Sequence, residues 1–131
     1  MSLVIQNNFI VYKSSAGSGK TFTLVKEYLK LSLADKHNLS KAYKGILAVT
    51  FTNKAASEMK WRIIKALKEI SSGSNAMISQ LIAAELIISE SELKKRAEIV
   101  LTDILHNYSD FSIGTIDSFT HRIIRTFALD L

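Results

Sequence analysis

The 131-residue chain contains no cysteine, no proline and only five glycines. Without cysteine it can form neither a disulfide framework nor a thiolate metal site, and a reducing compartment is its natural location. No apolar run approaches the roughly 18 residues of a membrane-spanning helix, and the N-terminus lacks the basic and then apolar layout of a signal peptide. We therefore expect a cytoplasmic protein with no membrane partner.

What the chain does contain is enough apolar material for one globular domain. Hydrophobic residues make up 47% of the sequence, and the net charge at neutral pH is +5. A length of 131 residues is sufficient to bury a real core. The moderate positive charge suggests a polyanionic partner, without identifying it.

Residues 14–21 read S-S-A-G-S-G-K-T, which is the spelling of a phosphate-binding loop with serine in place of its first glycine. Its two glycines allow turns in which successive N–H groups surround phosphate oxygens at a helix N-terminus. The lysine can reach the β- and γ-phosphates, and the threonine hydroxyl can coordinate Mg²⁺. We expect ATP to be bound with Mg²⁺ by Ser15, Ala16, Gly17, Ser18, Gly19, Lys20 and Thr21, with Lys20 and Thr21 as the catalytic residues and Thr21 as the metal ligand.

Three runs rich in β-forming residues occupy 9–13, 45–51 and 111–115, and each is followed by a helical pattern. This order is typical of an α/β fold in which crossover helices flank a parallel sheet. After the second run, one apolar stripe predicts a long helix: it consists of Ala56, Met59, Ile63, Leu67 and Ile70.

Between about residues 74 and 108 there is no strand signal. A capping box, S-E-S-E at 89–92, predicts a helix that carries Leu93, Ala97 and Val100. We interpret this stretch as a helical insertion before the third strand.

A hydrolytic phosphate-loop enzyme also needs an acidic residue at the end of an apolar strand to hold Mg²⁺. Downstream of Lys20, neither of the two strand-like runs ends in aspartate or glutamate. The economical interpretation is that the chain is the N-terminal piece of a larger ATPase, and we expect the piece alone to be inactive.

Residues 48–63 read A-V-T-F-T-N-K-A-A-S-E-M-K-W-R-I, between the phosphate-binding loop and G-T-I-D-S-F-T-H-R-I-I-R at 114–125. With these three blocks in this order, the chain resembles the start of the UvrD/Rep/RecB/AddA family of superfamily 1 DNA helicases. The insertion resembles the helicase-nuclease branch, RecB and AddA. The resemblance implies a RecA-like P-loop fold in which residues 1–131 form the N-terminal portion of motor domain 1A, with the missing acidic strand and arginine sensors elsewhere.

The resemblance also implies which residues touch single-stranded DNA. An aromatic at a strand end can stack on a base, while hydroxyl and amide groups meet phosphates. For Phe51, a place in the core remains the alternative. The basic residues between 41 and 68 fit either a phosphate-binding flank or a solvated helix face. We assign DNA contact to Thr50, Phe51, Thr52, Asn53, Lys54, Arg62 and Thr115.

Asp117 departs from the family pattern, because relatives usually have histidine there. A carboxylate would repel a nearby phosphate. We expect Asp117 instead to cap the helix that starts after Thr115.

The function that these features favour is the ATP-binding part of an ATP-dependent DNA helicase or translocase in DNA repair or recombination. Its partners would be single-stranded DNA, a helicase-nuclease partner subunit and the remaining motor domains. For the phosphate-binding loop alone, a small-molecule kinase is an equally good explanation, but it leaves T-F-T-N-K-A-A unexplained. The third alternative is a module that binds nucleotide without hydrolysing it.

Overall fold

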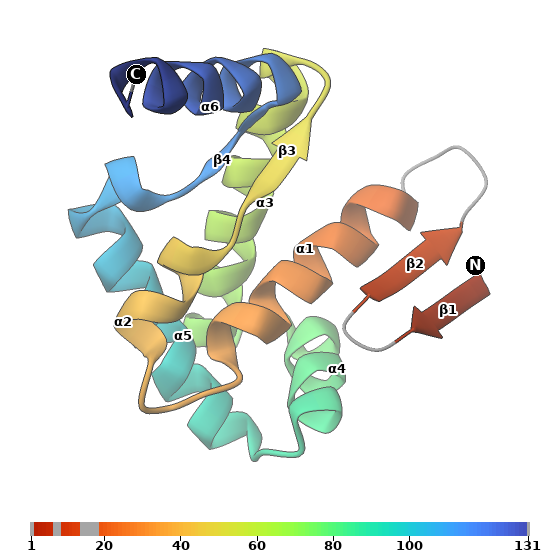
Figure 1. Cartoon of the computed structure of the whole chain (residues 1–131). Coiled ribbons are helices and arrows are strands. Elements are labelled where there is room, and N and C mark those ends of the chain that lie inside the picture. Colours follow the sequence, from red (N-terminus) through yellow and green to blue (C-terminus); the bar gives the residue numbers. More distant parts are fainter. Residues whose placement is uncertain (1, 7–8, 14–18, 131) are drawn as a thin grey trace.

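The computed structural model describes residues 2–6, 9–13 and 19–130 of the chain. Its helices are α1 (Gly19–Leu33), α2 (Leu39–Ala42), α3 (Asn53–Ser72), α4 (Ala76–Leu86), α5 (Glu90–His106) and α6 (Ile116–Asp130), with 3₁₀ turns η1 (Tyr43–Gly45) and η2 (Tyr108–Asp110). Its strands are β1 (Ser2–Gln6), β2 (Phe9–Lys13), β3 (Ala48–Thr50) and β4 (Ile113–Thr115). In Figure 1 the β1–β2 hairpin lies to one side, beyond α1, and α6 lies near the carboxyl ends of β3 and β4.

The strand expected at 9–13 is present as β2, but it is not part of a parallel sheet with the other two. It pairs with β1 in antiparallel register, from Gln6 opposite Phe9 to Ser2 opposite Lys13. Strands that lie close together in the sequence pair at little entropic cost, whereas a parallel pairing requires a long crossover connection. The expected three-stranded parallel sheet is therefore wrong for the described residues.

The parallel pairing that the sequence predicts is found between β3 and β4. Ala48 lies opposite Ile113, and Thr50 lies opposite Thr115. Only three residues of the expected strand 45–51 pair as β3: Gly45 belongs to η1, residues 46–47 lead into the strand, and Phe51 is exposed to solvent. The helices α3, α4 and α5 connect the two strands, as a parallel pair requires. The result is a helix-rich α/β fold with a two-stranded parallel sheet.

The core lies mainly where α3 packs on α5 and α1. All five residues of the predicted α3 stripe are buried, and Ile63 has no exposed surface. From α5, the buried apolar residues are Leu93, Ala97, Val100 and Ile104. The α5 helix is thus an integral part of the core, although its sequence position suggested an insertion.

Arg96 of α5 fastens the end of α1 to this core. Its Nη1 donates to the carbonyl oxygens of Leu33 at 2.9 Å and Ala34 at 3.1 Å. Its Nε donates to Glu92 Oε1 at 3.0 Å. The last carbonyls of a helix have no partner within the helix, so the guanidinium satisfies groups that would otherwise be buried without a donor. Arg96 is only 7% exposed.

Helix ends follow the local sequence signals. Ser89 Oγ accepts from the N–H of Glu92, which confirms the predicted start of α5. Helix α3 ends at Gly73, whose φ of 75° lies in the left-handed region that favours glycine. Residues 35–38 form a turn, and residues 39–44 form α2 and the start of η1, which bury Leu39 and Tyr43.

Within the part of the chain that the structure describes, no helix combines the length and the apolarity needed to cross a membrane.

Candidate nucleic-acid interface

The expected ATP-binding residues lie only partly within the described structure. Ser15, Ala16, Gly17 and Ser18 lie outside the described residues. Gly19, Lys20 and Thr21 are the first three residues of α1. The first turn of a helix offers unpaired N–H groups to an anion, as the sequence motif predicts. The nucleotide site stays a prediction.

Apart from Arg62, the predicted DNA-binding residues lie at or next to the carboxyl edge of the β3–β4 pair. The backbone of α3 begins just after β3 and that of α6 directly after β4. Because parallel strands end at the same edge, Thr50 and Thr115 are direct neighbours in the register. Two sequence blocks that are far apart along the chain therefore lie side by side (Figure 1).

The three threonines of this edge use their hydroxyl groups to hold the backbone. Thr50 Oγ1 donates to the carbonyl of Thr52 at 3.0 Å. Thr52 Oγ1 accepts from the N–H of Ala55 at 3.0 Å and so caps α3. Thr115 Oγ1 accepts from the N–H of Ser118 at 3.1 Å. These hydroxyls shape the edge, while Phe51, Asn53 and Lys54 are exposed.

The capping role expected of Asp117 is wrong. Thr115 supplies the hydroxyl that accepts from the first turn of α6. Asp117 is the second residue of that helix and is exposed. Its carboxylate is there favoured by the positive end of the helix dipole, which needs no hydrogen bond.

Phe51 projects into solvent from this edge. Its side chain is 88% exposed, so the core alternative does not hold in this structure. An isolated exposed phenylalanine needs no explanation by itself, but this one lies between the end of a strand and the cap of a helix. That is the position from which a flat ring can meet a base.

A cleft of about 460 Å³ opens between α3, the β4 segment and the start of α6, and its lining includes Asn53, two residues after Phe51. We call it the α3–α6 cleft. Its polar lining residues are Asn53, Ser57, Lys60, Ser109, Ser112, Thr115, Ser118 and Arg122. None of the described residues that line it is acidic. The cleft therefore combines hydroxyl donors with two cations and is suited to an anion.

Arg62 is the one predicted DNA-binding residue that the structure places elsewhere. It lies on the far side of α3, where it lines a pocket with Phe22 and Val25 of α1. Its Nη2 is 3.5 Å from Glu58 Oε1. Lys60, two positions earlier, lines the cleft instead. The helical spacing from Asn53 through Ser57 to Lys60 is the signal that identifies this face in the sequence.

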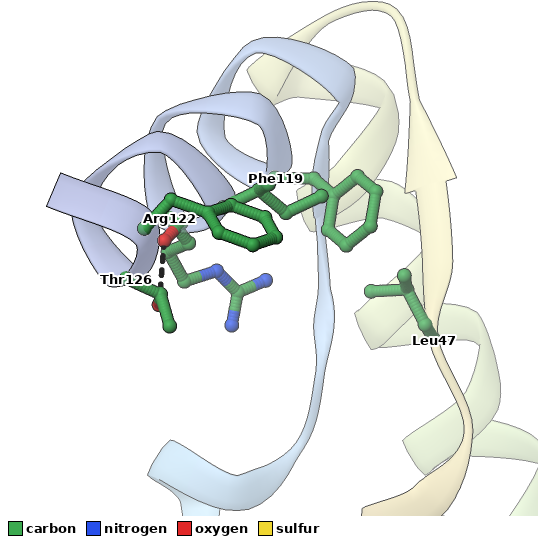
Figure 2. A pocket seen from close by; sticks show the side chains of 6 residues that line it. Leu47, Phe119, Arg122 and Thr126 are labelled. Atoms are coloured by element: carbon green, nitrogen blue, oxygen red, sulfur yellow. Dashed lines mark hydrogen bonds between the residues drawn. The ribbon is translucent and has the colours of Figure 1, made fainter. Parts of the chain in front are cut away.

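Arg122 lies outside the predicted set, although it stands in the third sequence block. It lines both the α3–α6 cleft and an adjoining apolar groove of about 270 Å³ formed with Leu47, Phe119 and other residues. Figure 2 shows the Arg122 side chain extending from α6 into this groove. Its aliphatic stem thus has apolar neighbours while its guanidinium remains available to polar groups.

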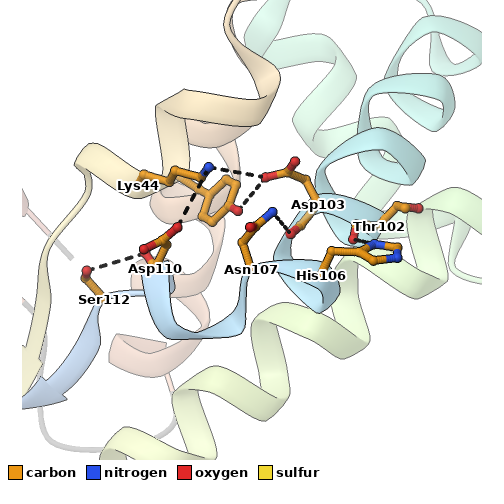
Figure 3. A network of polar contacts seen from close by, with 8 residues as sticks. Lys44, Thr102, Asp103, His106, Asn107, Asp110 and Ser112 are labelled. Carbon is orange, nitrogen blue, oxygen red and sulfur yellow. Dashed lines mark hydrogen bonds and ion pairs between the residues drawn. The ribbon is translucent and has the colours of Figure 1, made fainter.

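A polar network lies around the two 3₁₀ turns and the end of α5 (Figure 3). Lys44 Nζ is 4.0 Å from Asp103 and 3.8 Å from Asp110. Tyr43 donates its hydroxyl hydrogen to Asp103. Burial, together with this hydrogen bond, raises the pKa of Tyr43 well above its usual range, so the phenol remains a donor. The network joins η1, which precedes β3, to η2, which precedes β4.

The order of the three sequence blocks agrees with a comparison against protein families. Residues 2–131 match the UvrD/REP helicase N-terminal domain. The chain belongs to this family. The match includes the segment that connects the phosphate-binding loop, the β3 edge and the β4 edge.

Curated relatives of this UvrD/REP domain include helicase-nuclease subunits. An ATP-dependent helicase/nuclease subunit of Streptococcus suis is 32% identical over 122 residues, which cover 93% of this chain and 8% of that protein. The protein of the same name from Listeria welshimeri is 36% identical over 118 residues, covering 90% and 8%. RecBCD enzyme subunit RecB of Buchnera aphidicola is 33% identical over 116 residues, covering 86% and 10%.

The chain therefore spans at most a tenth of the length of these relatives. No solved structure matches it significantly.

Proposed function

We propose that this chain is the ATP-binding part of an ATP-dependent DNA helicase or translocase that moves along single-stranded DNA. The observation that carries the proposal is Phe51, 88% exposed at the carboxyl edge of the β3–β4 pair. The α3–α6 cleft, whose lining begins with Asn53 two residues further along the chain, contains cations and hydroxyls. A stacking ring next to phosphate-binding groups is the arrangement that single-strand binding requires.

In this proposal Phe51 stacks on a base, while Asn53 and Lys54 meet the backbone. Each stacked base contributes about 1 to 3 kcal/mol and does so without regard to sequence. A motor that moves along DNA of any sequence requires binding that is independent of sequence. Thr50, Thr52 and Thr115 hold the edge in place through the hydrogen bonds described above. In this proposal their backbone groups contact the DNA strand.

The proposed nucleotide site lies at the start of α1. The main-chain donors of its first turn and the Thr21 hydroxyl are the groups that a triphosphate with Mg²⁺ requires. Lys20 would hold the β- and γ-phosphates, and Thr21 would ligate Mg²⁺. Hydrolysis of the bound ATP, with Mg²⁺, would supply the free energy for movement along DNA. We propose accordingly that the fold is RecA-like and that residues 1–131 belong to motor domain 1A.

The relatives extend this proposal to the cellular setting. By their names, the helicase/nuclease protein of Streptococcus suis and RecB are subunits of larger enzymes. We propose that this chain acts in DNA repair or recombination in the cytoplasm, together with further motor domains and a helicase-nuclease partner subunit. Hydrolysis would depend on those further domains.

The test measures the binding of two ligands, ATP and single-stranded DNA, which the proposal places at different sites on this chain. Wild-type protein should bind a fluorescent ATP analogue in the presence of Mg²⁺, and a fluorescein-labelled oligothymidine by anisotropy. Lys20→Ala should abolish nucleotide binding and leave DNA binding intact. Phe51→Ala should do the reverse, weakening DNA binding roughly 5- to 150-fold, which corresponds to the loss of one stacked base.

Circular dichroism of both variants checks that the loss is not caused by unfolding. If Phe51→Ala binds DNA as tightly as the wild type, the stacking role is wrong. If the protein binds ATP but transfers phosphate to a small acceptor and ignores DNA, the helicase proposal fails in favour of a kinase.

A further inference from the structure

The two strands of the parallel pair are preceded by matching segments. Each strand begins at the same distance along the chain from the 3₁₀ turn before it, η1 in one case and η2 in the other. The η1–β3 segment (residues 43–50) and the η2–β4 segment (residues 108–115) therefore have the same length. Because Ala48 lies opposite Ile113, a displacement of one turn relative to the other would shift the register of the strands.

The pairing of the strands is too short to fix this register firmly. Only three residues of each strand pair, and one further hydrogen bond joins the Ala48 N–H to the Ser112 carbonyl at 3.2 Å. A slip of one residue would turn the side chains of a strand to the opposite face and separate Thr50 from Thr115. Contacts outside the strand pair must therefore hold the register.

Asp103 of α5 contacts the starts of both segments (Figure 3). Its carboxylate accepts the hydroxyl hydrogen of Tyr43, the first residue of η1. Its backbone carbonyl accepts from the N–H of Asn107 at 2.9 Å and from Asn107 Nδ2 at 3.1 Å, immediately before η2. Lys44 Nζ, in η1, lies within 4.0 Å of both Asp103 and Asp110, the last residue of η2. One residue of α5 thus holds both turns on the same helix.

The hydrogen bond between Tyr43 and Asp103 is the strongest of these contacts. Tyr43 has no exposed surface, and a hydrogen bond to a charged acceptor is stronger than one between neutral groups. Without the carboxylate, the phenol would remain as a buried donor that has lost its acceptor. The side chains of Lys44 and Asp110 are 37% and 51% exposed, and exposed ion pairs contribute little.

We infer that Asp103 is a positioning residue for the DNA-binding edge: by holding η1 and η2 on α5, it fixes the register in which Thr50 and Thr115 lie side by side. This inference rests on the proposed function, since Phe51 at that edge is the ring that stacks on a base. Asp103 does not itself line the α3–α6 cleft. It acts through the two segments, so α5 has a part in DNA binding although it lies away from the strand.

Removal of the Asp103 charge has an effect of its own on DNA binding, and that effect has the opposite sign. A chain that loses a carboxylate becomes more basic, which strengthens its binding to phosphates. A positioning role predicts weaker binding instead. The direction of the change therefore separates positioning from simple electrostatics.

The test combines Asp103→Leu with Phe51→Ala in a double-mutant cycle. Anisotropy of the labelled oligothymidine is measured at low salt for the 131-residue chain and its variants, at a temperature where circular dichroism shows each to be folded. Asp103→Leu should weaken binding roughly 5-fold or more, because the stacked base loses its place. The double variant should bind no more weakly than Phe51→Ala, because Asp103 acts through a ring that is already absent.

Hydrogen exchange measured by NMR reports on the strand pair without DNA. The Ala48 amide should exchange faster in Asp103→Leu than in the wild type, relative to the Ile63 amide of α3, and should be unchanged in Phe51→Ala. Tyr43→Phe keeps the ring in the core and removes the same hydrogen bond, so it should reproduce both effects if Asp103→Leu does not fold. Asp103→Asn keeps an acceptor for the phenol and should restore most of the wild-type affinity.

Matched controls lie on the same helix. Ile104→Val truncates the completely buried neighbour of Asp103 and lowers stability without touching either turn, so DNA affinity should be retained. Glu98→Leu removes an exposed carboxylate of α5 and should leave binding unchanged or slightly tighter.

The outcomes separate the inference from the proposed function. If Phe51→Ala weakens binding while Asp103→Leu and Tyr43→Phe leave DNA affinity and Ala48 exchange unchanged, the inference is overturned and the proposed function stands. If the effects of Asp103→Leu and Phe51→Ala multiply, Asp103 does not act through the edge and the inference fails. It fails also if Ile104→Val weakens binding as much as Asp103→Leu does, because loss of stability then explains both. If the wild-type chain binds no single-stranded DNA even at low salt, the proposed function fails and the inference with it.

Discussion

Helices α3 and α6 begin in the same way, but their apolar faces are packed differently. Each starts at the carboxyl end of one strand of the parallel pair, and a threonine hydroxyl caps the first turn of each. The apolar stripe of α3 is buried against α5 and α1. The apolar residues of α6, by contrast, are largely exposed, with Phe127 at 65%. Periodicity in the sequence thus determines which face of a helix is apolar, but not whether another element covers it.

The largest expected effect comes from truncating one apolar side chain in each helix. Ile63→Ala in α3 should lower the free energy of unfolding by about 2 to 5 kcal/mol, because Ile63 is completely buried and a cavity remains. Phe127→Ala in α6 should change it by no more than about 0.5 kcal/mol. Urea denaturation followed by circular dichroism gives both values. A cost for Phe127→Ala as large as that for Ile63→Ala would mean that the α6 face is covered in solution, which sedimentation would then show as self-association.

An intermediate effect is expected from two arginines that differ in their surroundings. Arg96→Met should lower the free energy of unfolding by about 1 to 3 kcal/mol, because it leaves the Leu33 carbonyl buried without its donor. Arg62→Met removes a largely exposed ion pair with Glu58 and a buried Nε that has no hydrogen-bond partner, so it should cost between about 0 and 1 kcal/mol. Thermal and urea unfolding of the two variants, side by side, measure the difference. Equal costs would show that the anchoring of α1 by Arg96 contributes little.

The same contrast explains how much of the fold could be predicted. The α3 stripe and the Ser89 cap follow from residues within a few turns of one another, and both are confirmed. In α1, helical spacing is less informative: Leu24, Tyr28 and Leu31 recur at that spacing, yet Tyr28 is buried while Leu24 and Leu31 are exposed. Local spacing cannot supply the neighbour that decides burial. The pairing of β2 with β1 escapes prediction for a related reason, because strand runs carry no information about their partners.

At the candidate site, the sequence blocks identify the carboxyl edge of the β3–β4 pair, but they do not show on which side of α3 a residue lies. Asn53 and Phe51 are predicted from the block that contains them, and the structure places both at the carboxyl edge. The same block led to Arg62 rather than Lys60, although only Lys60 of the two lies on the same side of α3 as Asn53. Positions two apart on a helix point in different directions, which membership in a block does not reveal.

The smallest effect concerns the start of α6, where Thr115 and Asp117 compete for the role of cap. Thr115→Ala removes the hydroxyl that accepts from the Ser118 N–H and should lower the free energy of unfolding by about 1 kcal/mol. Asp117→Asn retains that cap and loses only a charge favoured by the helix dipole, so about 0.3 kcal/mol is expected at low salt and less at high salt. Thr115→Ser should retain most of the wild-type stability. Urea unfolding at two salt concentrations resolves the pair: a larger and salt-sensitive cost for Asp117→Asn than for Thr115→Ala would return the capping role to the carboxylate.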